Sequence, residues 1–349
     1  MKAESTFMWK EIMEEPDALR RCAAENIRTV KQIVSEIGKR GIRHVTVCAR
    51  GTSDNAAIYG KYAFEILTGM PIASAAPSVL ALYRSDVDWK DSLVIGLSQS
   101  GGTEDVSQII ASARKQGALT VGITNTAGSL LENSAEFVLL CSAGEEKSVA
   151  ATKTFVTEMY LMVQIAASLA NNKEIQQELV TLPDQLSHVL ELKEAARSAA
   201  ERYRFLQESF VLARGLNYPV ALEAALKIQE TTYIGAKAFA ISDFYHGPKA
   251  MVQEDTALLV LAPKGPSFHD AVEFLHRMED TGADVLVFSD DDELCGRADA
   301  SVHIPCTGSD FVTPFYNAAA AQMLACQLAV VRGNNPDHPR GLKKVTAIN

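Results

Sequence analysis

The sequence repeats its landmarks at one fixed spacing, and this repeat constrains the fold more than any other feature. The matching residues, each pair 164 positions apart, are Arg50 and Arg214, Leu97 and Leu261, Val121 and Val285, and Val138 and Val302. A spacing of this size corresponds to a whole domain. The chain is therefore expected to contain two copies of one domain, joined near residues 172–200.

Short apolar runs alternate with helical stretches in both copies. The first copy has expected strands at residues 44–49, 92–97, 119–124 and 136–140, with helices at 54–68, 104–116 and 151–170. In the second copy, an apolar run at 210–213 precedes a helical pattern at 220–233. This alternation is typical of a parallel sheet with helices on both faces. The sequence thus predicts the α/β class, with two tandem doubly wound domains of the flavodoxin-like type.

The remaining segments flank these two copies. The expected boundaries are 1–40 for an N-terminal helical segment, 41–172 for the first copy, 173–200 for linking helices, 201–334 for the second copy and 335–349 for a C-terminal tail that closes the site. Because proline lacks a backbone N–H, Pro16 and Pro183 are expected to break helices. Gly38 and Gly41 are expected to end the N-terminal helix.

Charge and cysteine usage exclude several classes of function. A net charge of −10 argues against nucleic acid as a partner, so an anionic substrate must be held by local donors. The six cysteines are scattered without metal-ligand spacing, which indicates reduced thiols and no metal site. The N-terminus lacks an apolar signal segment, and no apolar run is long enough to span a bilayer. We therefore expect a cytoplasmic protein without a membrane partner, a metal or another cofactor.

The segment SQSGGT, residues 98–103, is chemically suited to phosphate. Hydroxyls of Ser98, Ser100 and Thr103 lie beside glycines and the positive end of the following helix. It is neither a Walker A loop nor a dinucleotide fingerprint, and the alternative is a plain polar loop. The equivalent APKGP segment, residues 262–266, has lost both serines and carries two prolines. Only the first copy is therefore expected to bind an anion.

Three charged residues fall in an otherwise apolar helix of the second copy. Glu223, Lys227 and Glu230 are spaced i, i+4, i+7, so they project from one helix face. One interpretation is a solvated stripe with a Glu–Lys pair. The other is a carboxylate base beside an ammonium, at a strand–turn–helix unit where α/β folds bind ligands. Together with His246, these residues form a set able to transfer protons.

Two further loops could complete a site in the first copy. Thr52 and Ser53 follow the first strand, so their hydroxyls could donate to a sugar or a phosphate. The loop after the fourth strand could supply another wall through Ser148, Val149 and Ala151, or it is an ordinary exposed loop.

The polar C-terminal tail is either a frayed terminus or a functional segment. Pro339, Arg340 and Leu342 are candidate anchors that precede Lys344. A lysine delivered by a closing tail would suit imine formation with a carbonyl.

These motifs together resemble a known family. Residues 8–349 are similar to the isomerase half of glucosamine-6-phosphate synthase and its relatives, which consists of two sugar isomerase (SIS) domains. The resemblance rests on the segments MWKEIMEEP, RGTSDNAA, SQSGGTED, EKSVAATKTF, NYPVALEAALKIQET, FYHGP and HPRGLKK. It implies a phosphosugar substrate, whose phosphate would be held by Ser98, Gln99, Ser100 and Thr103. The residues lining the sugar site would be Thr52, Ser53, Val149 and Ala151.

The resemblance also implies catalytic roles. Glu230 would be the base that moves a proton between C1 and C2, with Lys227 beside it and Glu223 in support. His246 would assist ring opening from the partner subunit of a homodimer. Lys344 would form an imine with the open-chain ketose.

The sequence departs from the synthase pattern in ways that bear on the reaction. No glutamine-hydrolysing domain precedes the isomerase half, so glutamine is not expected to be used. Arg50 replaces a usual cysteine and Gly102 a common glutamate, and the RGTSDNAA form resembles stand-alone deaminases. We therefore expect conversion of glucosamine 6-phosphate, or a close relative, to fructose 6-phosphate and ammonia. The alternatives are a fructose-amine-6-phosphate deglycase, an ammonia-dependent synthase and a non-catalytic phosphosugar-sensing module.

Overall fold

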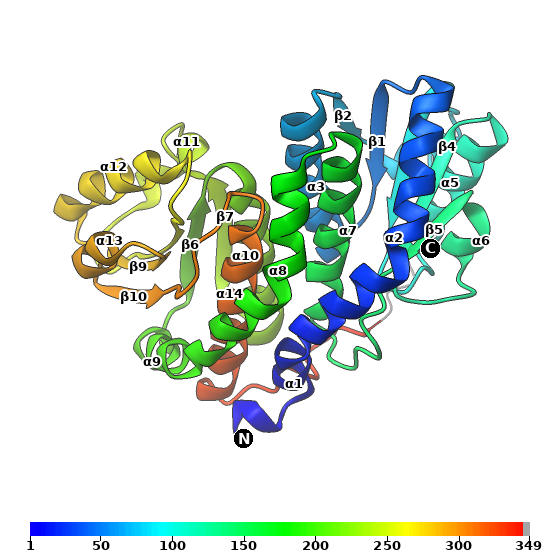
Figure 1. Ribbon diagram of the computed structural model, residues 1–349. Helices are drawn as coiled ribbons and strands as arrows, with labels where there is room; N and C mark the ends of the chain where they lie inside the picture. The colour runs from blue at the N-terminus through cyan, green and yellow to red at the C-terminus, as the bar shows by residue number, and fades with distance from the viewer. Residues whose placement is uncertain (345–349) are drawn as a thin grey trace. The chain divides into compact units, whose positions relative to one another are not determined.

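The computed structural model describes residues 1–344 and divides them into two compact units, each with its own sheet (Figure 1). The N-unit comprises residues 17–146 and 153–180. The C-unit comprises residues 1–16, 147–152 and 181–344. The C-unit therefore contains the whole second copy, together with the first 16 residues of the chain and a short loop from the first copy.

The sheet of the N-unit has five parallel strands in the order β2-β1-β3-β4-β5. Their bounds are His44–Cys48 for β1, Ile72–Ser74 for β2, Ser92–Leu97 for β3, Leu119–Thr124 for β4 and Phe137–Leu140 for β5. The register of β1 and β3 pairs Cys48 with Gly96, so both strands end at the same edge of the sheet. This strand order is that of the flavodoxin-like fold.

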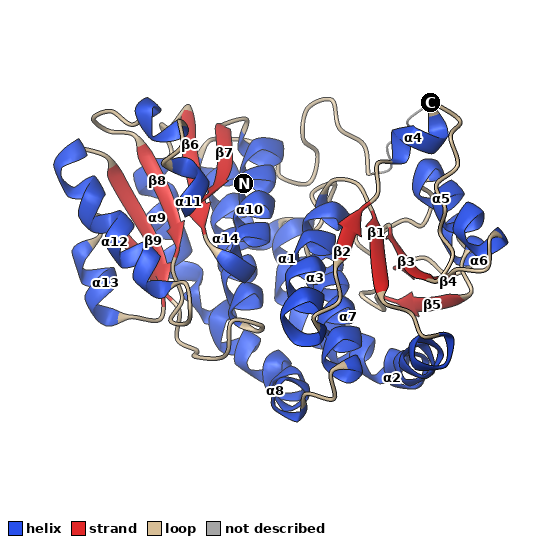
Figure 2. Ribbon diagram, turned by 90° about the horizontal axis from the view of Figure 1, so that it is seen from above, coloured by secondary structure: helices blue, strands red, loops and turns tan. Residues whose placement is uncertain are grey.

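Helices cover both faces of this sheet (Figure 2). On one face α3 (Thr52–Thr68) packs against α7 (Lys153–Leu169), and on the other lie α4 (Pro77–Ala81), α5 (Glu104–Lys115) and α6 (Leu130–Ser134). The buried face of α5 consists of Val106, Ile109, Ile110 and Ala113, which follow the helical period and pack in one core with Val94 of β3. Apolar periodicity in the sequence thus fixes which side of α5 faces the sheet.

The C-unit repeats this architecture. Its parallel strands have the order β7-β6-β8-β9-β10, with bounds Glu208–Ala213 for β6, Gly235–Ala240 for β7, Ala257–Leu261 for β8, Asp284–Ser289 for β9 and Ala300–His303 for β10. One face carries α9 (Lys193–Tyr203), α10 (Tyr218–Thr232) and α14 (Thr313–Val331); the other carries α11 (Ile241–Phe244), α12 (Phe268–Met278) and α13 (Asp292–Arg297). Phenylalanines in edge-to-face contact lie at the centre of the second core: the Phe244 ring centroid lies 5.3 Å from that of Phe210 and 5.8 Å from that of Phe274.

The predicted two-copy α/β fold is confirmed. The spacing of 164 residues relates more elements of the two copies than the four residue pairs identified in the sequence. It also relates β2 to β7, α4 to α11 and α6 to α13, which the sequence patterns did not reveal. These first-copy elements are three to five residues long. Such short segments contain too few residues to show a hydrophobic period.

The segments outside the two sheets are helical, and three expectations about them are wrong. Pro16 is the second residue of α2 (Glu15–Arg40), where no intrahelical N–H is needed, so it starts this helix instead of breaking one. Gly38 lies inside α2. The helix ends at Arg40, and the next residue, Gly41, has the left-handed conformation (φ 62°). Pro183 lies within α8 (Lys173–Val189), and the interruption comes at η2 (Leu190–Leu192). No helix within residues 1–344 has the length and apolar character that crossing a bilayer requires.

The aromatic core of the C-unit generates a stability prediction. Phe244→Ala removes a fully buried ring that contacts three others, so we expect a loss of about 3–5 kcal/mol in the free energy of unfolding. The matched control, Phe205→Ala, removes a ring that is 77% exposed, and should change stability by less than about 0.5 kcal/mol. Urea denaturation measures both values. Equal losses in the two variants would contradict this assignment of the core.

Candidate functional site

The strand order creates a switch point in each sheet, where doubly wound folds bind ligands. In the N-unit the chain leaves β1 and β3 in opposite directions, and their following loops emerge side by side. The loop after β1 leads directly into Thr52 and Ser53, the first two residues of α3, and residues 98–103 form the loop after β3. The hydroxyl-rich segments identified in the sequence therefore share one edge of one sheet.

The 98–103 loop presents hydroxyls at the N-terminus of α5. Ser98 is buried, and its Oγ lies 2.8 Å from Oγ1 of Thr103. Thr103 occupies the N-cap position of α5, but its side chain makes no capping hydrogen bond to the helix. The first-turn amides and the positive end of the helix dipole are therefore not closed off by that side chain. This geometry suits an anion.

Backbone contacts hold the loop in shape. Gln99 O accepts a hydrogen bond from Asn125 N (3.0 Å), and Gly101 O accepts one from Leu131 N (2.9 Å). Gly101 has a φ of 62°, and a Cβ on it would lie 2.2 Å from Oγ of Ser129. Both backbone conformation and space therefore require glycine at this position.

Ser53 is oriented by a buried carboxylate that the sequence analysis did not identify. Its Oγ donates a hydrogen bond of 2.9 Å to Oε1 of Glu158 in α7, and both residues are buried. Because the serine proton points at Glu158, the oxygen of Ser53 is left to accept hydrogen bonds. A sugar hydroxyl, which donates, suits this position better than a phosphate oxygen. Thr52 beside it is half-buried.

In each unit an ion pair joins the loop after the first switch-point strand to the first turn of the helix that follows the second. Arg50 contacts Asp105 in the N-unit, with Nη2 at 2.5 Å and Nε at 3.0 Å from Oδ2. In the C-unit, Nε of Arg214 lies 2.6 Å from Oδ2 of Asp270. The repeated arginine was visible in the sequence, but its partner was not. Burial raises the pKa of the nearby Asp54, and the positive charge of Arg50 partly offsets that effect.

The charged residues of α10 form a compact buried set in the C-unit. The side chains of Glu223 and Lys227 are 2% and 1% exposed, and that of Glu230 is 21% exposed. Lys227 Nζ lies 2.6 Å from Oε2 of Glu230 and 3.2 Å from Oε1 of Glu223. The interpretation of these residues as a solvated stripe is therefore wrong.

Two opposing effects act on Lys227. Burial lowers the pKa of its ammonium, but the charges of Glu223 and Glu230 and their hydrogen bonds raise it by more, to about 12. Lys227 is therefore a fixed positive charge at neutral pH, not a neutral amine nucleophile.

The repeat shows that this charged set belongs to one copy alone. At a spacing of 164 residues, Glu223, Lys227 and Glu230 correspond to Tyr59, Ala63 and Ile66 of α3. The first copy therefore has neutral side chains at all three positions.

The first helix, α1 (Phe7–Met13), holds a short loop and the tail together within the C-unit. Its Glu11 carboxylate accepts hydrogen bonds from the backbone N–H groups of Lys147 and Ser148. At the start of α1, the two carboxylate oxygens of Asp337 accept from the N–H groups of Phe7 and Met8, each at 2.8 Å. Neither carboxylate was identified from the sequence, because each acts on backbone far away in the chain.

The last described residue of the tail, Lys344, contacts the same loop. Lys344 Nζ donates a hydrogen bond of 2.7 Å to the carbonyl of Ser148. Arg340 anchors the tail. Its guanidinium lies 3.8 Å from the centre of the Tyr233 ring, and its backbone N–H donates a hydrogen bond of 2.9 Å to Tyr233 Oη. Pro339 is buried, whereas Leu342 is 44% exposed, so the prediction of Leu342 as an anchor is wrong. The tail residues 345–349 lie outside the described residues.

Three remaining candidates have simpler surroundings. Val149 and Ala151 are half-buried in the loop that Glu11 holds. His246 is exposed in the turn after α11, and its ring makes no hydrogen bond to another described residue. Within the C-unit, the structure thus gathers the α10 set around Lys227, and separately Lys344 with the 147–152 loop.

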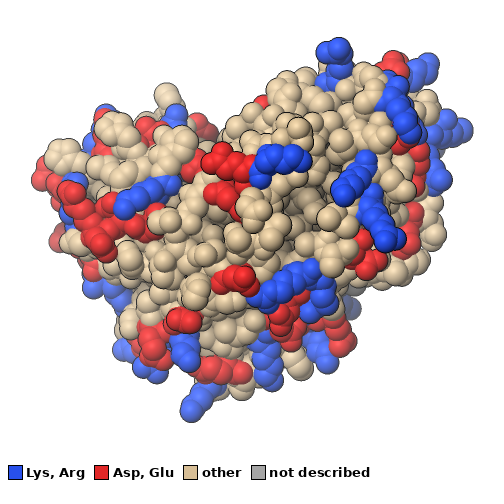
Figure 3. All heavy atoms as spheres, viewed as in Figure 1, with Lys and Arg blue, Asp and Glu red and all other residues tan. Residues whose placement is uncertain are grey.

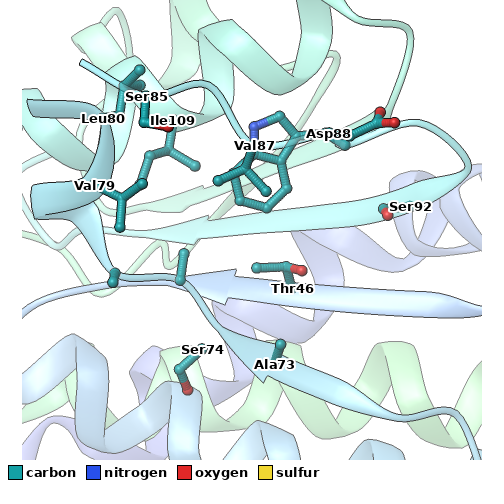
Figure 4. A pocket seen from close by; sticks show the side chains of 13 residues that line it. Thr46, Ala73, Ser74, Val79, Leu80, Ser85, Val87, Asp88, Ser92 and Ile109 are labelled. Carbon is teal, nitrogen blue, oxygen red and sulfur yellow. The ribbon is translucent and has the colours of Figure 1, made fainter. Parts of the chain in front are cut away.

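A cavity of about 300 Å³ in the N-unit lies apart from the predicted site residues (Figure 4). It is lined by Thr46 of β1, Leu80 of α4, Trp89 of the following loop and Ile109 of α5. None of the predicted binding residues lines it. Among residues 1–344, no three His, Cys, Asp or Glu side chains are grouped to hold a metal ion.

Comparisons with known proteins find relatives with the same two-domain fold. The SIS domain family model matches residues 40–168 and 208–332. The glutamine–fructose-6-phosphate aminotransferase (isomerizing) of Thermococcus kodakarensis is 32% identical over 98% of this chain. The C-terminal domain of glucosamine-fructose-6-phosphate aminotransferase from Francisella tularensis has a TM-score of 0.86 at 25% identity, covering 96% of this chain and 98% of that one. The chain spans 58% of the length of the Thermococcus relative.

A more distant structure shares the fold. Glucosamine-6-phosphate deaminase from Thermotoga maritima has a TM-score of 0.79 at 21% identity, covering 98% of this chain and 100% of that one.

Gly101, the glycine with positive φ in the 98–103 loop, yields a binding prediction. Gly101→Ala forces an unfavourable backbone conformation and a clash with Ser129, so we expect affinity for inorganic phosphate to fall at least about tenfold. Gly102→Ala is the matched control, since its Cβ would meet only Oγ of Ser100 at 3.5 Å. Calorimetric titration measures both. Unchanged affinity in Gly101→Ala would show that the loop does not hold the anion.

The buried set on α10 yields a pH-dependent stability prediction. Lys227→Met removes the ammonium that two carboxylates share. We therefore expect the free energy of unfolding to fall by about 3–5 kcal/mol at pH 8. At pH 5 the difference from the wild type should shrink, because protonation of the stranded carboxylates relieves the buried negative charge. Denaturation at both pH values measures the difference. A loss independent of pH would contradict the shared charge.

Proposed function

Since the chain belongs to the SIS domain family, with one copy of the domain in each half, we propose that it is a phosphosugar isomerase acting as a deaminase. The proposed reaction converts glucosamine 6-phosphate, or a close relative, and water to fructose 6-phosphate and ammonia. The observation that carries this proposal is the buried contact of 2.6 Å between Lys227 and Glu230, because it sets an ionised carboxylate beside a fixed positive charge. The names of the relatives support an amino-sugar phosphate as substrate.

Substrate binding would begin at the 98–103 loop. The phosphate would accept hydrogen bonds from the hydroxyls of Ser98, Ser100 and Thr103 and the amide of Gln99, at the positive end of α5. Thr52, Ser53, Val149 and Ala151 would line the sugar. Because Ser53 donates to Glu158, its oxygen would accept a hydrogen bond from a sugar hydroxyl. This arrangement fixes one end of an open-chain substrate.

Glu230 would then act as the base. It removes the proton from C2 of the open-chain aldose, and the electron pair of that bond forms the C1–C2 double bond while O1 takes up a proton. The proton on Glu230 exchanges with solvent, and Glu230 then delivers a proton to C1, which leaves an iminium at C2. Water adds to C2 and ammonia departs, giving the ketose. General acid–base transfer of this kind contributes about 10²–10⁴-fold to the rate.

Lys227 and Glu223 would support this step without exchanging protons themselves. The ammonium of Lys227 stabilises the negative charge of Glu230, and Glu223 holds Lys227 from its other side. The raised pKa of Lys227, about 12, keeps this charge in place across the working range of pH.

Two further residues would act at other points of the cycle. Lys344 would form an imine with the ketose carbonyl from its position on the tail. His246 would assist ring opening in the site of a partner subunit, a role that suits its exposure and implies a homodimer.

Ammonia-dependent synthesis of glucosamine 6-phosphate is a second candidate. The identity of 32% to a protein named as an isomerizing aminotransferase favours it. Both reactions use the same proton transfer between C1 and C2. Progress curves started from fructose 6-phosphate with ammonium, and from glucosamine 6-phosphate alone, distinguish the directions.

The base assignment can be tested by substitution. Glu230→Gln keeps the shape of the side chain but removes its charge, so ammonia release from glucosamine 6-phosphate should fall at least about 10²-fold while phosphosugar binding persists. The control Glu194→Gln changes a carboxylate that is 68% exposed and should leave both unchanged. Retention of most activity in Glu230→Gln would refute the assignment.

A further inference from the structure

We propose that the chain has a second anion site besides the 98–103 loop. It lies in the C-unit, away from the switch point of that unit, and binds a small phosphate ester. The site is an open pocket of about 650 Å³ whose walls include Arg204, Phe205, Tyr233, Arg332, Asn334 and Arg340. All of its lining residues belong to the C-unit, and none of them is an aspartate or a glutamate. The proposal does not depend on the reaction proposed above.

The pocket lies at the opposite edge of the sheet from the switch point. Gln207, which lines it, directly precedes β6, and Thr232 and Tyr233 stand at the C-terminal end of α10. The switch-point loops of the C-unit follow the carboxyl ends of β6 and β8 instead. A ligand in this pocket would therefore contact neither of those loops.

Two of the three guanidiniums retain donors for a ligand. Arg340 stacks on Tyr233 at 3.8 Å, and its guanidinium makes no hydrogen bond to any residue among 1–344. Arg332 donates from Nη1 to the carbonyls of Arg204 (2.5 Å) and Leu206 (2.8 Å). These two bonds leave its second terminal nitrogen, Nη2, without a hydrogen-bond partner in the described part of the chain. Planar guanidiniums with free donors match the geometry of phosphate oxygens.

The third guanidinium is weakly engaged. Nη1 of Arg204 lies 2.8 Å from the carboxylate of Glu201, but both side chains are about half exposed, so solvent screens this pair. Its guanidinium also lies 4.6 Å from the centre of the Phe205 ring. That ring is 77% exposed and offers an apolar surface beside the charges. A phosphate ester with a flat organic group fits this combination better than a bare anion.

Two features oppose anion binding, and the local charge outweighs them. The helices α10 and α14 both end at this pocket, and each C-terminus carries roughly half a negative charge. Together with Glu201 they amount to roughly two negative charges, against three guanidiniums. The pocket therefore stays positive in a chain where 43 acidic residues outnumber 33 basic ones and acidic side chains are abundant on the surface (Figure 3).

The position of Arg340 gives the site a consequence for the tail. This residue holds the tail against Tyr233, the C-cap of α10, and it stands four residues before Lys344. A phosphate bridging Arg340 and Arg332 would tie the tail to the end of α14. Occupancy should therefore slow amide hydrogen exchange in residues 338–342.

Titration with phenyl phosphate tests the proposal, with inorganic phosphate for comparison. The full chain carries Ser98→Ala and Ser100→Ala, so that binding at the 98–103 loop does not contribute. We expect phenyl phosphate to bind more tightly than phosphate and to lose affinity as salt rises. Arg340→Gln and Arg204→Gln should each weaken binding at least fivefold. Arg277→Gln, which removes an arginine stacked on Tyr245 and paired with Glu273, should not change it.

Absence of phenyl phosphate binding would overturn the proposal. Binding that is unchanged in both Arg340→Gln and Arg204→Gln would overturn it as well. An equal loss in Arg277→Gln would also overturn it, because the effect would then reflect overall charge. Hydrogen exchange of the tail in Arg340→Lys, which keeps the charge, should still slow on addition of phenyl phosphate. Unchanged exchange in both the wild type and this variant would refute the link to the tail.

Discussion

The chemistry proposed for this molecule depends on one ammonium shared by two carboxylates inside the C-unit. Lys227 is almost fully buried, and only the proximity of Glu223 and Glu230 makes its charge tolerable there. Removing an ion from water is costly, so such a group on a helix is seldom retained for stability alone. What the arrangement supplies is a carboxylate with a fixed charge at 2.6 Å, at the partly exposed end of the set. That is the property expected of a base that must stay ionised and reach a substrate.

The internal repeat supports the proposal that one fold supplies two different functions, anion binding in one copy and proton transfer in the other. Both copies keep the strand order, the flanking helices and an Arg–Asp pair that joins one switch-point loop to the helix after the other. They differ in side chains: the first copy has the serine-rich loop, and the second has the charged α10. The APKGP segment, which is the second copy's equivalent of the serine-rich loop, has also changed: its Lys264 forms an ion pair with Asp291. Binding and proton transfer can therefore diverge independently on a common framework.

The sequence predicted the fold well where a residue pattern is long, and poorly where it is short. Strands such as β3 and β4 agree with their predicted bounds, because six-residue runs that contain several Leu, Val and Ile residues and no charged residue leave little ambiguity. Pro183 did not break α8, since one proline removes a single N–H and the rest of the helix can compensate.

Within the candidate site, the residue types were predictable, but the contacts between distant segments were not. Glu158 and Asp337 act on groups more than a hundred and more than three hundred positions away, and nothing local marks either carboxylate. The burial of Glu223 and Lys227 also lay beyond the sequence pattern, because helical spacing shows which residues share a face but not what covers that face. The roles of Glu230, His246 and Lys344 in turnover remain predictions.

The most direct test of the account is the transfer of solvent hydrogen to carbon. Incubation of the wild type with glucosamine 6-phosphate in deuterium oxide, followed by NMR of the sugar, should show deuterium at C1 of the fructose 6-phosphate formed. Glu230→Gln should bind the sugar and incorporate none. Deuterium at C1 in that variant, at the rate of the wild type, would contradict the central claim that the carboxylate beside Lys227 moves the proton.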